Sequence, residues 1–164
     1  MTASWSKDQL LDEMRQYTTL LEAKNAALAD LSATSIEMWS TLSASESADI
    51  SDVLRRREQH CKRCVEASNR IKSSSGMVEI ASQAAETVGG ELGDLSQKVL
   101  ALYNKSQTLS EEILTRQQQC EAILKARLDD TAKALRQSVQ RRKLDAAYGP
   151  AHKHGTPIFL DRQR

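Results

Sequence analysis

The sequence predicts an all-α protein, built as an elongated antiparallel helical hairpin or three-helix coiled-coil-like bundle with a projecting C-terminal helix and a flexible tail. Aromatic residues make up only 4% of the 164 residues, while helix-favouring and polar surface residues dominate. Apolar residues recur every three or four positions over long stretches, which is the period of one side of an α-helix. Both prolines, Pro150 and Pro157, lie near the C-terminus. We therefore expect one helical domain over residues 1–148 and a tail over residues 149–164.

The first helix is expected over residues 5–44. Ser4 or Ser6 can cap it, because a serine side chain accepts a hydrogen bond from the free backbone N–H groups of the first turn. Polar residues around Ser45 and Asp49 mark its end and the start of the next helix. Its seam consists of apolar residues with Lys24 and Ser35 as polar interruptions: Leu10, Met14, Tyr17, Leu21, Leu28, Leu31, Met38 and Leu42.

The second helix is expected over residues 48–88, and the short connection makes it an antiparallel neighbour of the first. Two places could end it. One is the run Ser73–Gly76, where poor helix formers cluster, and the other is the glycine-rich run Gly89–Gly93. We favour the second place, because the two helices then have similar lengths and bury their seam throughout.

The third helix is expected over residues 94–147, with Asp94 as its cap. Its apolar residues are spaced by three and four, or by seven where Ser106 and Arg116 fill the intermediate steps, and they become sparser beyond Cys120. The seam consists of Leu92, Leu95, Val99, Leu102, Leu109, Ile113 and Cys120. A helix of about 50 residues is longer than a hairpin of about 40, so its C-terminal part is expected to project without an internal partner. An amphipathic face among basic residues continues there, marked by Leu124, Leu128, Leu135, Val139 and Leu144.

Tyr148 ends this helix immediately before a Gly-Pro pair, so no further helical turn can cover its ring. An exposed aromatic ring beside an unpaired apolar face suits a docking site. The alternative is a helix-end contact in which the ring folds back on Leu144.

No residue cluster indicates catalysis, a metal or a cofactor. Cys61 and Cys64 form one Cys-x-x-Cys pair without a second pair, and on a helical seam small apolar residues of this kind belong to the core. Neighbouring carboxylates such as Glu111 and Glu112 point about 100° apart on a helix and are badly placed for joint acid-base work. We expect no enzyme, no metal site and no cofactor, and we expect Trp5 and Trp39 to serve as core anchors.

Membrane insertion and nucleic-acid binding are also not expected. No window holds the roughly 18 unbroken apolar residues of a membrane span, and the N-terminus lacks a basic region followed by an apolar run. The basic stretches lack interleaved aromatic residues that would stack on bases. The sequence thus predicts a cytoplasmic protein.

The C-terminal motif resembles a known family. Ala147-Tyr148-Gly149-Pro150, a glycine-bearing linker and then Phe159-Leu160-Asp161-Arg162 resemble the end of FlgN-type flagellar export chaperones, in which long helices also form an antiparallel hairpin. The resemblance implies a cytoplasmic chaperone that binds helical terminal segments of hook-filament junction (hook-associated) proteins. It would deliver them to the export gate of the flagellar type III secretion machine.

The resemblance also implies roles for individual residues. The C-terminal amphipathic helix would hold the cargo at its five apolar residues, and Tyr148 would dock at the export gate. The alternative from another class is a structural coiled-coil scaffold or self-associating helical adaptor, whose seams are satisfied within one oligomer. Under this alternative the chain could form a homodimer.

Overall fold

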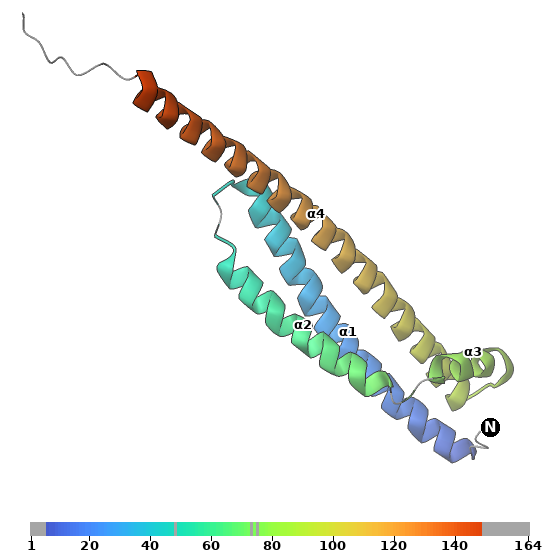
Figure 1. The fold of residues 1–164 in the computed structure, drawn as a ribbon. Coiled ribbons are helices and arrows are strands. Elements are labelled where there is room, and N and C mark those ends of the chain that lie inside the picture. Colours follow the sequence, from blue (N-terminus) through green and yellow to red (C-terminus); the bar gives the residue numbers. More distant parts are fainter. Residues whose placement is uncertain (1–5, 48, 73, 75, 149–164) are drawn as a thin grey trace, which may run out of the picture. The chain divides into compact units, whose positions relative to one another are not determined.

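The computed structural model describes residues 6–47, 49–72, 74 and 76–148, and it confirms the all-α fold class (Figure 1). Four helices follow in order: α1 (Lys7–Ala44), α2 (Ser51–Lys72), α3 (Met77–Thr87) and α4 (Glu91–Tyr148). The chain divides into two compact units, Met1–Leu124 and Lys125–Arg164. Trp5 lies outside the described residues. Within them, no helix combines the length and the apolar character needed to cross a membrane.

Local capping explains where α1 begins. The Ser6 hydroxyl accepts a hydrogen bond from the backbone N–H of Gln9 at 3.3 Å, and the Gln9 side chain accepts one from the Ser6 N–H at 3.0 Å. This reciprocal pair is a capping box, which satisfies two backbone donors at the helix start. Ser6 is therefore the cap, and Ser45 ends the helix in an extended conformation.

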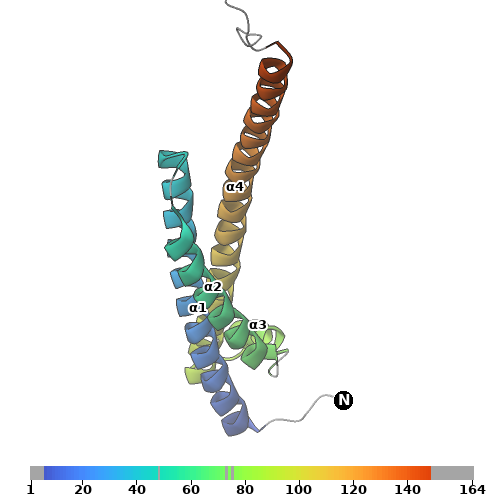
Figure 2. The same cartoon turned by 60° about the vertical axis from the view of Figure 1, so that its left-hand side comes forward.

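The helices α1 and α2 form the predicted antiparallel hairpin and lie side by side in both views (Figures 1 and 2). Glu37 pairs with Arg56 at 2.6 Å, and Asp30 pairs with Arg63 at 2.9 Å. Residue numbers thus fall along α1 as they rise along α2, which defines opposite chain directions.

The N-terminal part of α4 runs in the same direction as α1. Arg15 pairs with Glu91, and Glu22 pairs with Lys98 at 2.8 Å, so residue numbers rise together along the two helices. The first unit is therefore an up-down-up arrangement, in which α2 is the only long helix of opposite direction among the described residues.

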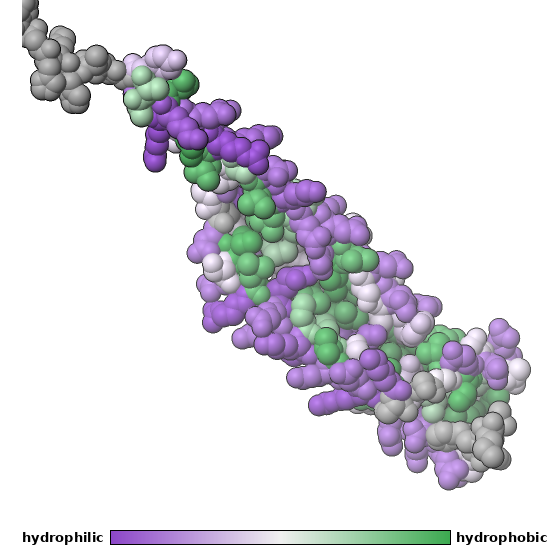
Figure 3. Space-filling view, in the orientation of Figure 1, coloured by the Kyte–Doolittle hydropathy of each residue, from purple (hydrophilic) through white to green (hydrophobic). Residues whose placement is uncertain are grey.

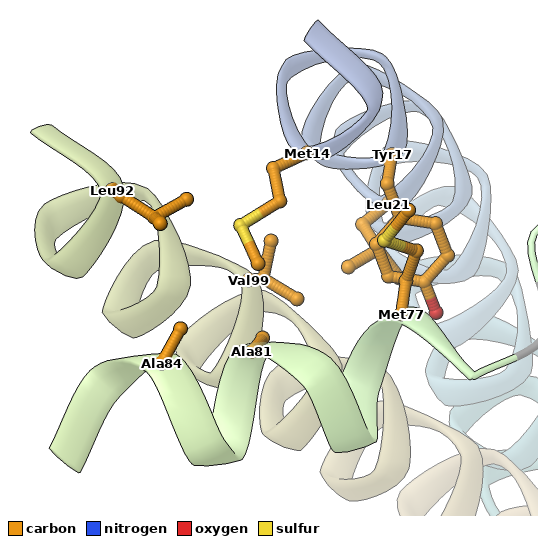
Figure 4. Packing of buried hydrophobic residues seen from close by; sticks show 8 residues of the cluster. All are labelled: Met14, Tyr17, Leu21, Met77, Ala81, Ala84, Leu92 and Val99. Carbon is orange, nitrogen blue, oxygen red and sulfur yellow. The ribbon is translucent and has the colours of Figure 1, made fainter. Parts of the chain in front are cut away.

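Three clusters of buried side chains form the core of this unit. The first joins α1, α3 and the start of α4, the second joins the middle of α1 to α2 and α4, and the third lies where α1 ends. In the first cluster Ala81 of α3 packs beside Met14 of α1 and Val99 of α4 (Figure 4). The first cluster therefore has α3 as the third helix that packs against α1 and α4. In the other two clusters α2 takes this place.

The expected second helix over residues 48–88 is wrong, because the chain breaks at both candidate places. The helix α2 ends at Lys72, and Gly76 precedes α3 with φ at +96°, a left-handed conformation that cannot continue an α-helix. Val88 then ends α3 in an extended conformation. Because the chain breaks after Lys72, α3 does not continue α2 and packs in the first cluster instead.

A buried polar contact joins α1 to α4. Asn25 is only 4% exposed, and its Nδ2 donates to the carbonyl oxygen of Leu102 at 2.9 Å. The Ser106 hydroxyl donates to Oδ1 of Asn25 at 2.8 Å. Both ends of the amide therefore have partners, as burial of a polar group requires.

The helix α4 begins three residues earlier than expected, at Glu91 instead of Asp94. Asp94 donates its backbone N–H to the carbonyl of Gly90, so it lies inside the first turn and is not the cap. Gly93 is buried in this turn. A Cβ atom built at Gly93 would lie 2.4 Å from the carbonyl oxygen of Val88.

Replacing Gly93 with Ala is expected to lower the free energy of unfolding by about 1–3 kcal/mol, since the added methyl group must displace backbone atoms. Urea unfolding followed by circular dichroism would measure the change. Gly89→Ala is the matched control, because a Cβ at Gly89 meets no atom within 4 Å. If both substitutions lowered the free energy of unfolding equally, the contact between residue 93 and the Val88 carbonyl would not explain the loss.

Candidate helix-binding surface on the C-terminal part of α4

The C-terminal part of α4, within the second unit, carries large apolar side chains that are exposed. Leu128 is 70% exposed, Leu135 65% and Val139 44%, whereas Cys120 in the first unit is 1% exposed. In Figure 3, hydrophobic residues lie among hydrophilic ones at the surface of this segment. Exposed apolar side chains gathered on one segment are typical of an interaction surface.

Three of these residues share one side of the helix. At about 100° per residue, Leu128, Leu135 and Val139 fall within about 40° of one another, and we call this set the apolar stripe. Leu124 precedes Leu128 by four residues and is 40% exposed. An open hollow of about 300 Å³ lies on the stripe, lined by Leu135, Arg136, Val139 and Gln140. The predicted site thus retains a coherent apolar surface.

Leu144 does not belong to the apolar stripe, which corrects the expected single face. Five residues separate Val139 from Leu144, so Leu144 lies about 140° around the helix from Val139. It shares a side instead with Tyr148, four residues later. Leu144 is 58% exposed and Tyr148 83%, and we call these two residues the end patch.

The exposure of Tyr148 bears on its two predicted arrangements. A ring folded back on Leu144 would hide much of both side chains, yet Tyr148 is the more exposed of the two. The ring is therefore accessible to a partner. Its role in docking stays a prediction.

Basic residues flank the apolar stripe on both sides. Measured from Leu128, Lys125, Arg136 and Lys143 lie about 60–80° to one side, and Arg142 lies about 40° to the other. The three acids of the segment, Asp129, Asp130 and Asp145, lie about 100° or more away. The helical spacing of the sequence alone contains this arrangement of charges.

Lys133 and Asp130 of this segment form an ion pair at 3.5 Å. Both side chains are at least 70% exposed, so the pair contributes little to stability. It lies away from the apolar stripe. The bases beside the stripe thus remain the dominant charges around it.

The part of α4 in the first unit is covered by α1 and α2. In the third core cluster, Cys120 and Ile123 pack with Met38, Leu42 and Val53. Trp39 is half-buried at this cluster, and the Arg116 guanidinium carbon lies 4.7 Å from the centre of its ring. The core role expected for Trp39 is confirmed, together with a cation–π contact between α1 and α4.

The cysteines occupy core positions. Cys64 is buried and Cys61 half-buried in the second cluster, and Cys120 is buried in the third. Burial raises the pKa of the Cys64 and Cys120 thiols, which disfavours the reactive thiolate. Among the residues that the structure describes, no three His, Cys, Asp or Glu side chains are grouped so that they could hold a metal ion.

The chain was also compared with protein families, with curated proteins and with solved structures, and no match was found.

Proposed function

We propose that this protein is a FlgN-type export chaperone. It binds the helical terminal segments of hook-filament junction proteins in the cytoplasm and delivers them to the flagellar type III export gate. The observation that carries the proposal is the exposed apolar stripe on the C-terminal part of α4. The C-terminal Tyr148-Gly149-Pro150 motif supports the choice of family.

A helix that presents an apolar stripe to solvent can bind a second amphipathic helix. Such partners pack side chains at helical spacing into each other's grooves. Complete burial of an exposed Leu or Val contributes about 1.5–3 kcal/mol, before the entropy cost of association is subtracted. Burial of Leu128, Leu135 and Val139 therefore adds a limited apolar contribution to the complex, which suits a carrier that must release its cargo.

The end patch provides a separate place for the export gate. Because Leu144 and Tyr148 lie on another side of the helix than the apolar stripe, cargo bound to the stripe leaves them accessible. In this proposal Leu124, Leu128, Leu135 and Val139 hold cargo. Leu144 joins Tyr148 in gate docking.

The proposal predicts that Leu135→Asp weakens cargo binding at least 10-fold, since the charge would have to be buried in the complex. Titration calorimetry of the full chain with purified terminal segments of hook-filament junction proteins from the same genome would measure this effect. Leu114→Asp is the matched control, because Leu114 is a similarly exposed leucine of α4 outside the stripe. Tyr148→Ala should leave cargo affinity unchanged.

The competing scaffold function makes a different prediction for the same variant. If Leu135→Asp dissociates an oligomer of the wild-type chain in analytical ultracentrifugation, the stripe serves self-association. Terminal segments that fail to bind the wild-type chain would also count against the chaperone.

A further inference from the structure

We infer that the occupant of the apolar stripe is an acidic amphipathic helix from another protein, and not a second copy of this chain or its own C-terminal tail. The inference rests on the proposed function and specifies the chemistry of the cargo. The electrostatics of residues 125–148 carry it.

The charges closest to the apolar stripe all have one sign. Lys125, Arg136 and Lys143 form a line along one side, and Arg142 lies on the other. No acidic residue of this segment lies within about 80° of Leu128. Along residues 125–143, a helix laid on the stripe would therefore place its own flanking residues beside Lys and Arg.

A second copy of this chain would bring like charges together. The segment 125–148 contains seven Lys and Arg residues against three Asp, which is a net charge of +4. Pairing two such stripes would oppose +4 to +4 within a Debye length of about 8–10 Å, where screening by salt is incomplete. The charge pattern thus disfavours a homodimer through this surface.

The chain's own tail has the same sign. Residues 149–164 contain Lys153, Arg162 and Arg164 against Asp161, so their net charge is +2 with the histidines neutral. The apolar run Ile158-Phe159-Leu160 would have to carry these bases onto a basic surface. An acidic partner instead gains attraction and excludes both of these competitors.

The spacing of the bases describes the expected partner. Lys125, Arg136 and Lys143 are separated by 11 and then 7 residues, or about 16 and 10 Å along the helix at 1.5 Å per residue. A complementary helix has apolar residues every three or four positions and Asp or Glu at matching intervals along one flank. The unequal intervals also favour one direction of that helix over the reverse.

Two synthetic helical peptides would test the inference on the full chain. Both carry the same apolar stripe, and their flanking positions are Glu in one and Lys in the other. By fluorescence anisotropy we expect the Glu peptide to bind at least 10-fold more tightly than the Lys peptide, and to weaken as salt is raised.

Charge reversal in the chain provides the second arm. The triple variant Lys125→Glu, Arg136→Glu, Lys143→Glu should reverse the preference between the two peptides. A control with the same change in net charge away from the stripe should keep the preference, with the substitutions Lys7→Glu, Lys72→Glu and Lys105→Glu. Circular dichroism would verify that both variants remain helical.

Each failure has its own meaning. Equal binding of both peptides, binding of neither, or a wild-type dimer that Leu135→Asp dissociates would overturn the inference. If natural terminal segments bind but the stripe triple variant binds them equally well, the chaperone proposal stands and the acidic partner is wrong. If the Glu peptide binds as expected and the natural segments do not, the inference stands and the chaperone proposal fails.

Discussion

Asn25→Asp is expected to lower the free energy of unfolding by about 3 kcal/mol at pH 7. The amide of Asn25 donates to the carbonyl of Leu102, and a carboxylate in its place has no hydrogen to donate. Two oxygen atoms that both carry negative charge would then face each other in a site that is 4% exposed. The bond from Ser106 would survive but could not offset the buried charge.

The loss should depend on pH with a definite sign. Burial raises the pKa of the introduced carboxyl above its unfolded value of about 3.9, so the folded state binds more protons. Stability should therefore recover as the pH falls from 7 through the raised pKa, because the protonated carboxyl can again donate to Leu102. Urea unfolding at pH 7 and pH 5 would measure the recovery.

Asn104→Asp provides the control, since Asn104 is exposed on α4. It should change the free energy of unfolding by less than about 0.5 kcal/mol at either pH. A similar loss in both variants would show that the buried amide has no special importance for joining α1 to α4.

The same position shows what periodicity could not predict. The spacing assigned the polar interruption of the first seam to Lys24, yet Asn25 is the buried residue and Lys24 is half-buried. Steps of three and four are both compatible with one side of a helix, so the pattern cannot choose between neighbours. The choice depends on Ser106, 81 residues away, which offers a partner that an amide can use and a lysine cannot.

The apolar seam of α4 was predicted more successfully. Of its seven apolar residues, Leu92, Val99, Ile113 and Cys120 are buried, and Leu95, Leu102 and Leu109 are half-buried. A long pattern of this kind averages over local ambiguity, so it identifies a buried side reliably. The prediction that the same side of the helix extends to Leu144 was wrong. Leu144 follows Val139 by five residues and therefore lies about 140° away around the helix.

The break before α3 has a local signal in the sequence. The serine and glycine run Ser73–Gly76 marked it, but matching the lengths of two helices favoured a continuous one. The packing of α3 against α1 and α4 is tertiary, and the spacing of residues within one helix carries no information about it.

Leu21→Ala is expected to lower the free energy of unfolding by about 2–5 kcal/mol, because the leucine is fully buried between α1 and α3. Leu114→Ala removes the same atoms from a side chain that is 55% exposed, and should cost less than about 0.5 kcal/mol. Denaturant unfolding of both variants would measure the difference. Equal losses would contradict the burial of Leu21.

Where the substitution accelerates hydrogen exchange tests whether the three core clusters unfold independently. An isolated helix of 11 residues is not stable in water, so α3 depends on the first cluster for its structure. Leu21→Ala should therefore accelerate amide hydrogen exchange most strongly in α3 and at the start of α4. Leu42→Ala, an equally buried substitution in the third cluster, should accelerate exchange around Val53 and Cys120 instead. If either variant accelerates exchange uniformly through residues 7–124, the three clusters unfold as one cooperative unit, and α3 is held by the whole core instead of its own cluster.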